Sequence, residues 1–518
     1  MEKFDAPFIG LTDSLASLAK WQPDRIAVVC GDKRLTYLEF NRQVSKVANG
    51  LIRLGIKKGD KVGVYMLNSI EALQTIYGVV KAGGTVVPLS SMVPGDVLAM
   101  MVNDSDSRAL FVESGLLNAV ISPVKDQLKG VEENGFFSLG FEADGWNDYT
   151  QWINECSDEE PGIETKPDDD FNIVYSSGTT GVPKGIVHTN HCRYLFAMGL
   201  GLGFRIHSYA RTILTTPLYT NGTWMTLLPT LLLGGTVVIM PSFDPKLFME
   251  LVQKERCTHT FMVPTQFIVI MAHPDFEKYD LSSMEMMISA AAPLRENTKR
   301  EIIQKFGSRL AELYGLTEGF GTVLNPEEME GKTGSVGKPL TGGDMRIIDQ
   351  NDQELPWGEV GEIVGYQTGL MRGYYKQPEK TAECIWKDEH GRTFLKTGDV
   401  GRIDENGFLY ILDRKKDMIV SGGINIFASD IEEIIAKHPD VMDVAVIATP
   451  HEKWGESPVA LIIGKQGATA SEDEIKEWAN KQLAKYQRLT LVEFRNEFPR
   501  NALGKVLKRQ LREPYWKE

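Results

Sequence analysis

Short apolar runs alternate with amphipathic helical segments along the first two-thirds of the chain. Residues 61–66 and 85–88 predict buried strands, and residues 38–54 and 70–81 predict helices beside them. The same alternation returns over residues 212–263. Strands that alternate with helices are typical of a largely parallel sheet covered by helices. We therefore expect an α/β architecture for this part of the chain.

The pattern changes near residue 332, where short strands and turns replace the helices. Such strands, with glycine and Asn-Gly turns between them, predict a small β-barrel-like unit or antiparallel sheet. A charged run at 413–417 follows, and the helices and strands after it predict a compact α+β domain of about a hundred residues. We predict a large N-terminal domain at 1–412, a hinge at 413–417 and a small C-terminal domain at 418–518.

Composition narrows the class of protein. The chain has 518 residues, 42% of them hydrophobic, and a net charge of −14. This length suggests about three domains, and the negative charge argues against nucleic acid or anionic membranes as bulk partners. Five scattered cysteines indicate a reduced, cytoplasmic compartment without a disulfide frame or metal cluster.

Neither a secretory signal nor a membrane span is expected. The first ten residues lack a basic start and an apolar core. The long apolar stretch at 223–240 is interrupted by Pro229 and by the pair Gly234-Gly235. It therefore predicts a buried helix, a turn and a buried strand.

A predicted strand at 171–175 leads into a loop rich in hydroxyls and glycine. The loop reads Ser176-Ser177-Gly178-Thr179-Thr180-Gly181-Val182-Pro183-Lys184-Gly185. Backbone N–H groups freed by glycine, together with hydroxyls, can bind phosphate oxygens. A Walker loop needs lysine directly after its last glycine, whereas Lys184 precedes Gly185. The alternative is a flexible surface loop with turn chemistry.

The loop resembles the phosphate-binding signature of the adenylate-forming superfamily of acyl-CoA synthetases, adenylation domains and luciferases. Ala291-Ala292-Pro293-Leu294 and Tyr314-Gly315-Leu316-Thr317-Glu318 follow in the family's order. The resemblance implies that Ala291 lets adenine pass close to the backbone and that Tyr314 stacks on it. It also implies that Thr317 contacts phosphate and that Glu318 holds Mg²⁺. We count Glu312 among the ATP-binding residues. A strand end with a helix-capping threonine is the alternative.

Two further stretches suit a nucleotide. Asp399 ends a predicted strand, and its carboxylate can accept hydrogen bonds from a ribose diol, although an ordinary turn aspartate is the alternative. Arg414 could donate to the ribose or to phosphate, although a solvated linker would also contain it. By resemblance, Lys416 is the hinge about which a mobile C-terminal domain turns.

The pair Gly422-Gly423 after Ser421 allows close approach of a slender chain such as the pantetheine of CoA. The resemblance implies that this loop enters the active site when the thioester forms. Trp454 resembles a position that packs near CoA, and a buried core tryptophan is the alternative. The chain departs from the family at residues 486–489, which lack the usual lysine and proline.

The stretch from Pro499 to Lys505 resembles the superfamily's terminal loop with its catalytic lysine. A mobile point charge suits this role because it can neutralise a carboxylate that meets an α-phosphate. A basic C-terminal tail is the alternative. Lys505, Thr317 and Glu318 are thus the predicted catalytic residues.

The acyl pocket is expected around the apolar helix that follows Pro217. Its predicted walls are Tyr219, Thr220, Trp224, Met225, Ala290 and Gly315. A helical core residue is the alternative for Trp224. Short, branched, aromatic and alicyclic acids all remain open as substrates.

The resemblance implies an ATP-dependent acid–CoA ligase that uses ATP, Mg²⁺ and CoA. It would form an acyl-adenylate from a small carboxylic acid, then transfer the acyl group to CoA and release AMP. One alternative is a free-standing adenylation enzyme that loads a carrier protein. Against amino-acid activation, residues 217–222 contain no aspartate for a substrate ammonium. Another alternative is a nucleotide-binding regulatory protein without catalysis. No nucleic-acid partner or integral membrane segment is expected, and a homodimer is left open.

Overall fold

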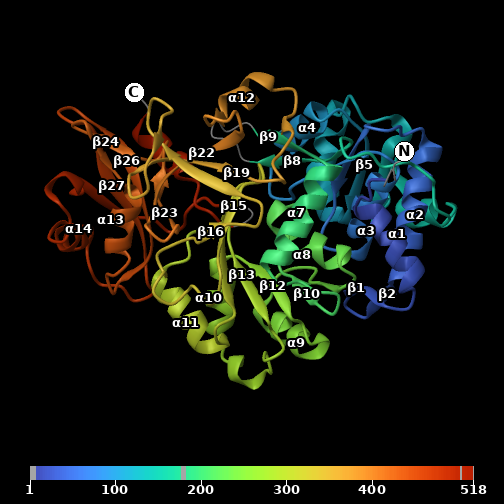
Figure 1. Cartoon of the computed structure of the whole chain (residues 1–518), viewed down its shortest axis with the longest axis horizontal. Coiled ribbons are helices and arrows are strands. Elements are labelled where there is room, and N and C mark those ends of the chain that lie inside the picture. The colour runs from blue at the N-terminus through green and yellow to red at the C-terminus, as the bar shows by residue number, and fades with distance from the viewer. Residues whose placement is uncertain (1–6, 177–182, 502–503, 517–518) are drawn as a thin grey trace. The chain divides into compact units, whose positions relative to one another are not determined.

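A computed structural model describes residues 7–176, 183–501 and 504–516 (Figure 1). It divides the chain into two compact units. The first holds the residues up to Thr333 with Pro339–Asp344 and Tyr366–Ile385, and the second holds Gly334–Lys338, Met345–Gly365 and the residues from Trp386 onward. The predicted boundaries at 412 and 417 stay a prediction.

The first unit contains an eight-stranded sheet in the order β20-β9-β8-β4-β3-β5-β6-β7. Strands β3 to β8 are parallel where they pair, whereas β9 is antiparallel to β8 and to β20. The strands are β3 (Lys61–Tyr65), β4 (Thr85–Pro88), β5 (Ser107–Glu113), β6 (Phe136–Leu139), β7 (Asn147–Asp148), β8 (Asp170–Ser176), β9 (Lys184–Thr189) and β20 (Gly373–Tyr374).

A second sheet of this unit has the neighbours β15-β14-β13-β12-β10-β11-β1-β2. Its central strands are parallel, and β2 and β15 pair antiparallel to their neighbours. The strands are β1 (Ile26–Cys30), β2 (Lys33–Thr36), β10 (Arg211–Leu214), β11 (Thr236–Ile239), β12 (His259–Met262), β13 (Met286–Ser289), β14 (Leu310–Gly315) and β15 (Gly321–Leu324), and β16 (Lys338–Pro339) follows at the unit boundary.

Helices cover both sheets, and one buried cluster connects α2, α3, α7 and α8 with strands of each sheet (Figure 1). Helix α2 starts at a reciprocal cap between Thr36 and Glu39 and ends at Gly55, whose φ is 94°. The helices are α1 (Leu11–Trp21), α2 (Tyr37–Leu54), α3 (Ile70–Lys81), α4 (Gly95–Asp104), α5 (Ser114–Ile121), α6 (Tyr149–Asn154), α7 (Asn190–Gly203), α8 (Asn221–Leu232), α9 (Pro245–Glu255), α10 (Pro264–Met271), α11 (Glu296–Phe306) and α12 (Pro378–Glu383).

The second unit contains a sheet in the order β18-β17-β19-β22-β21, with β23 beside β22, in which the β17–β18, β19–β22 and β22–β23 pairs are antiparallel. It also contains a smaller sheet in the order β25-β24-β27-β26, with β28 beside β27. The strands are β17 (Asp344–Ile348), β18 (Glu354–Leu355), β19 (Gly361–Tyr366), β21 (Ile385–Lys387), β22 (Thr393–Ile403), β23 (Leu409–Arg414), β24 (Ile419–Ser421), β25 (Ile424–Ile426), β26 (Val441–His451), β27 (Gly455–Gly464) and β28 (Leu491–Phe494), and the helices are α13 (Ala428–Ile435), α14 (Glu472–Asn480) and α15 (Lys508–Arg512).

The predicted α/β class is confirmed, and so are the antiparallel strands and the smaller C-terminal α+β part. One local prediction is wrong. Asp399 does not end a strand, because β22 continues to Ile403. The strand is irregular at this point. Gly398 has φ of 72°, and the register between β22 and β23 shifts after Val400.

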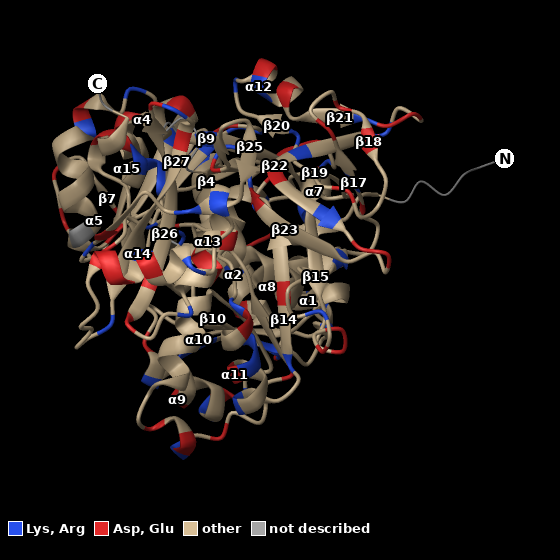
Figure 2. Cartoon of the chain, turned by 90° about the vertical axis from the view of Figure 1, so that its left-hand side faces the viewer, with Lys and Arg blue, Asp and Glu red and all other residues tan. Residues whose placement is uncertain are grey.

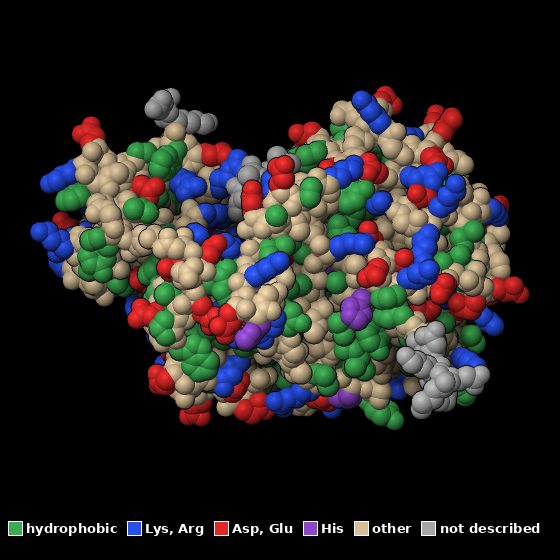
Figure 3. Space-filling view, turned by 45° about the horizontal axis from the view of Figure 1, so that its top comes forward, with side chains coloured by type: hydrophobic (Ala, Val, Ile, Leu, Met, Phe, Trp, Pro, Cys, Tyr) green, Lys and Arg blue, Asp and Glu red, His purple; other side chains and the backbone are tan. Residues whose placement is uncertain are grey.

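Acidic and basic side chains are interspersed in both views of the charges (Figures 2 and 3). All five cysteines are free. Within the described part of the chain, no helix has the length and apolar character needed to cross a membrane.

Candidate active site

The hairpin β8–β9 carries the predicted phosphate loop of the first unit. Ser176 and Lys184 are paired across the two strands. The loop members Ser177, Gly178, Thr179, Thr180 and Gly181 lie outside the described residues. Ser176 is at the carboxyl end of β8, the end at which ligands bind in α/β sheets.

Tyr374 connects two of the predicted ATP residues. Its hydroxyl donates a hydrogen bond to Glu318 Oε1 at 2.8 Å, and Lys184 Nζ lies 5.0 Å from the centroid of its ring. Burial and then the charge of Glu318 raise the pKa of Tyr374, so the hydroxyl stays a donor. Tyr374 was not among the predicted site residues, because the β20–β9 pairing that places it here joins residues almost two hundred positions apart.

Glu318 fits a magnesium ion shared with phosphates. Mg²⁺ commonly takes one or two carboxylates and completes its shell with phosphate and water oxygens. Among the residues the structure describes, no group of three or more His, Cys, Asp or Glu side chains could hold a metal by itself. Glu318, which accepts a hydrogen bond from Tyr374, matches the one or two protein carboxylates that Mg²⁺ commonly takes beside phosphates.

Thr317 is held through its backbone. Its carbonyl lies 2.8 Å from His188 Nε2, and His188 is on β9. Burial, and next the charge of Arg193, keep the pKa of His188 well below its usual value. The imidazole is therefore neutral near pH 7 and orients the Thr317–Glu318 segment without adding charge.

The predicted adenine residues follow β13 and β14. Ala291 is exposed and has φ of 73°, a left-handed conformation that is unfavourable for alanine. Tyr314 is half-buried and meets Phe320 edge to face. Glu312 is buried, forms an ion pair with Lys299, and has a pKa raised to about 6 by burial. These contacts give Glu312 a structural partner, and its role toward ATP stays a prediction.

The predicted acyl walls differ in exposure. Tyr219, Thr220, Met225 and Ala290 are buried, while Gly315 is exposed. The Tyr219 hydroxyl lies 3.5 Å from Oγ of Ser91, which was not among the predicted site residues. Trp224 belongs to the core cluster, and its Nε1 donates to Leu218 O at 2.7 Å. This placement favours the core interpretation of Trp224.

In the second unit, Asp399, Arg414, Lys416 and Lys505 come together. Asp399 and Arg414 face each other across β22 and β23, with Arg414 Nε 3.5 Å from Asp399 Oδ1. Burial and then the charge of Arg414 lower the pKa of Lys505 to about 7, against the opposing effect of Asp399. A lysine that sheds its proton near neutrality is able to change charge when an anion binds.

Three of the predicted CoA residues, Ser421, Gly422 and Gly423, lie where β24 turns into β25, and the fourth, Trp454, precedes β27. Gly422 and Gly423 have φ of 58° and 83°, which glycine adopts readily. Gly422 N donates to Trp454 O at 2.8 Å, and a methyl group at Gly422 would come within 2.9 Å of the Trp454 ring. Trp454 is 48% exposed, so the core alternative for this residue is wrong.

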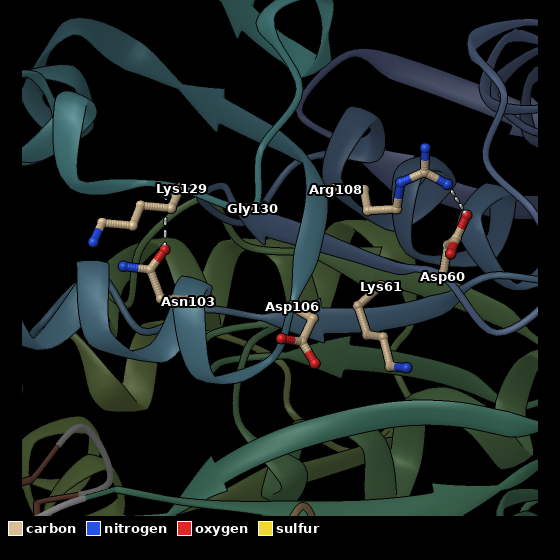
Figure 4. A pocket seen from close by; sticks show the side chains of 7 residues that line it. All are labelled: Asp60, Lys61, Asn103, Asp106, Arg108, Lys129 and Gly130. Carbon is tan, nitrogen blue, oxygen red and sulfur yellow. Dashed lines mark hydrogen bonds and ion pairs between the residues drawn. The ribbon is translucent and has the colours of Figure 1, made fainter.

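A separate pocket of 680 Å³ lies at the amino ends of β3 and β5 (Figure 4). Its lining residues are Asp60, Lys61, Asn103, Asp106, Arg108, Lys129 and Gly130. Since β3, β4 and β8 are parallel, this pocket is at the opposite edge of the sheet from Ser176. Arg108 is paired with Asp60 and Glu132, and Asp106 with Lys376, so much of the charge is satisfied internally.

Comparison with known proteins settles the family. Residues 15–375 match the AMP-binding enzyme family, and residues 430–505 match the AMP-binding enzyme C-terminal domain. The chain belongs to this adenylate-forming family. The first match alone covers more than half of the chain.

Several relatives that match most of the chain are named as acid–CoA ligases or synthases. The long-chain-fatty-acid–CoA ligase FadD13 of Mycobacterium tuberculosis is 32% identical, over 93% of this chain and 94% of its own. A feruloyl-CoA synthase of an Amycolatopsis species is 31% identical, over 95% and 96%. ATP-bound MatB from Rhodopseudomonas palustris is 30% identical, with a TM-score of 0.88 over 97% of this chain and 99% of that chain.

These findings confirm the predicted acyl-CoA synthetase branch of the adenylate-forming family and the predicted class, an AMP-forming acid–thiol ligase. They agree with the main prediction and not with a carrier-loading enzyme. The use of ATP and CoA is supported in the same way. The individual site residues, magnesium and a homodimer stay predictions.

Proposed function

We propose that this adenylate-forming enzyme activates a small carboxylic acid with Mg-ATP and transfers the acyl group to CoA in the cytoplasm. The observation that carries the residue assignment is the grouping of Lys184, Glu318 and Tyr374. Three segments far apart in the sequence supply these side chains at the carboxyl end of β8 and β14. A cation, a carboxylate and a hydroxyl donor at a strand end suit a metal-bound triphosphate.

In the first half-reaction the acid's carboxylate attacks the α-phosphate of ATP, and pyrophosphate leaves. Lys184 and the hydroxyl loop bind phosphate oxygens, Thr317 contacts the α-phosphate, and Lys505 brings positive charge to the developing negative charge. This is stabilisation by preorganised charges. Magnesium held by Glu318 would neutralise phosphate oxygens.

In the second half-reaction the CoA thiol attacks the acyl carbon, and AMP leaves. The C-terminal domain turns at Lys416, so that Lys505 withdraws and Gly422-Gly423 approaches with the pantetheine chain. Trp454, exposed beside Gly422, offers a flat apolar surface to CoA. One site thereby serves two reactions through a conformational step.

The test mixes the purified protein with Mg-ATP and a panel of short, branched, aromatic and alicyclic acids. We expect acid-dependent release of pyrophosphate, followed by AMP and an acyl-CoA thioester once CoA is added. A phosphopantetheinylated carrier protein serves as the competing acceptor. ATP binding without pyrophosphate release for any acid, or transfer to the carrier protein alone, would overturn the proposal.

A further inference from the structure

Arg193 on α7 is a fully buried arginine in the first unit, with 0% of its surface exposed. Burial lowers the pKa of its guanidinium to about 9. No ion pair joins it to a carboxylate in the part of the chain that the structure describes. Burying a cation without an anionic partner costs desolvation free energy, which other contacts of the guanidinium must offset.

Neutral polar side chains from β8, β9 and α8 accept hydrogen bonds from the guanidinium of Arg193. Arg193 Nε donates to Asn172 Oδ1 at 2.7 Å, and Nη1 donates to Asn221 Oδ1 at 2.8 Å. Arg193 Nη2 lies 3.2 Å from His188 Nδ1. The guanidinium carbon also lies 4.9 Å from the centroid of the Trp224 ring. Arginine stacked on an aromatic face is favourable when both are desolvated.

The contact with Arg193 fixes the tautomer of His188. A guanidinium can only donate, so His188 Nδ1 must accept. The proton of the neutral imidazole is therefore on Nε2, which donates to the carbonyl of Thr317 at 2.8 Å. The chain of contacts runs from Arg193 through His188 to the segment that carries Thr317 and Glu318.

The other contacts lead to the remaining parts of the site. Asn172 is on β8, the strand that ends at Ser176. Asn221 is the first residue of α8 and follows Tyr219 and Thr220, two predicted acyl walls. Arg193 thus contacts the acyl segment, the strand of the phosphate loop and, through His188, the Thr317 segment.

We propose that Arg193 is a positioning residue that holds the acid-binding segment and the phosphate-binding segment in one fixed relation. This inference rests on the proposed function, because it assigns the two ends of the network to the acid and to ATP. The Asn221 contact orients the start of α8 and thereby the acid. The His188 contact orients Thr317 and thereby the α-phosphate in the transition state.

The two ends of the network predict different kinetic defects. Asn221→Ala should raise the KM for the acid about tenfold with little change in the kcat of adenylation. His188→Leu should lower that kcat about tenfold with little change in the KM for the acid. His188→Gln keeps an N–H donor for the Thr317 carbonyl and should restore most of the lost kcat. Arg193→Met should show both defects.

Lys81→Met is the matched control. Lys81 is also a buried cation of the first unit, and its Nζ contacts Asn41, Ser45 and Glu160, none of which belongs to the site. This variant should lower the Tm and leave both kinetic constants of the folded enzyme unchanged. It separates loss of stability from loss of positioning.

The experiment measures pyrophosphate release against acid concentration, together with the Tm of each variant. If Asn221→Ala and His188→Leu change the same constant, or if His188→Gln is no better than His188→Leu, the inference is wrong. Should Arg193→Met fail to fold, the variants of Asn221 and His188 still decide. Absence of acid-dependent pyrophosphate release in the unaltered protein would instead contradict the proposed function.

Discussion

Lys505 combines a catalytic assignment with an unusual charge state. Its pKa of about 7 comes from burial and from Arg414, and both effects belong to the protein without nucleotide. Phosphate oxygens beside the amine would favour its charged form. A lysine that is only partly protonated before the triphosphate arrives carries less of the cost of a positive charge near Arg414.

This charge state predicts proton uptake on ATP binding. At pH 8 the free enzyme's Lys505 is mostly neutral, and bound ATP raises its pKa, so close to one proton is taken up. Affinity for ATP should accordingly fall as the pH rises above 7. Titration calorimetry at pH 8 in buffers of different ionisation enthalpy measures the uptake. Lys505→Ala should show none, and equal uptake by the two proteins would contradict the prediction.

Ala291 gives a second prediction, on stability. Glycine at this position relieves the left-handed strain of φ 73°, so Ala291→Gly should raise the free energy of unfolding by up to about 1 kcal/mol. Ala292 has no positive φ, so Ala292→Gly should lower the same quantity by about 0.5–1 kcal/mol. Urea unfolding compares the two. Shifts of the same sign would refute the assignment of strain to Ala291.

At the scale of elements, the turn between β24 and β25 contains two glycines with different surroundings. Both have positive φ, but a methyl group at Gly423 would meet nothing within 4 Å, whereas one at Gly422 would meet the Trp454 ring at 2.9 Å. Alanine at either position would therefore have backbone strain, but only alanine at Gly422 would displace the Trp454 ring.

Gly422→Ala should therefore slow thioester formation about tenfold or more, equivalent to about 1.4 kcal/mol, and leave adenylation intact. Gly423→Ala should have a smaller effect on the same step. Supplying acyl-adenylate and CoA and following AMP release isolates this half-reaction. Equal losses in both variants would show that the contact with Trp454 is irrelevant.

The sequence predicted the elements better than their contacts. The periodicity of hydrophobic residues depends only on neighbouring positions in the sequence. It therefore predicted the alternation of strands and helices, and the short strands and turns that follow residue 332. The ordered motifs likewise pointed to Asp399, Arg414 and Lys505, which the structure brings together. Tyr374 could not be inferred, since its place beside Glu318 depends on a distant strand pairing. Nor could Arg193, because arginine is almost never fully buried.

At the scale of the molecule, Lys505 lies in one compact unit, and Ser176, Lys184, Thr317 and Glu318 lie in the other. The proposed mechanism requires the two units to cooperate in adenylation and to rearrange before CoA reacts. In that mechanism Lys505 takes part in the first half-reaction and not in the second.

Lys505→Ala should consequently lower the rate of adenylation on the order of 10²–10³-fold, the effect of removing one preorganised charge. Thioester formation from supplied acyl-adenylate and CoA should be largely spared. Separate assays of the two half-reactions check this. Equal damage to both would show that Lys505 is needed throughout or that the variant is misfolded, which the Tm distinguishes.

The interleaving of the two units along the chain also affects synthesis. Strand β20 is supplied by Gly373–Tyr374 and covers the edge of β9, yet β9 ends at Thr189. A nascent polypeptide must therefore wait for nearly two hundred further residues before that edge is covered, and an uncovered edge invites pairing with other chains. We expect ribosome-bound intermediates stalled between these points to be the ones that chaperones retain.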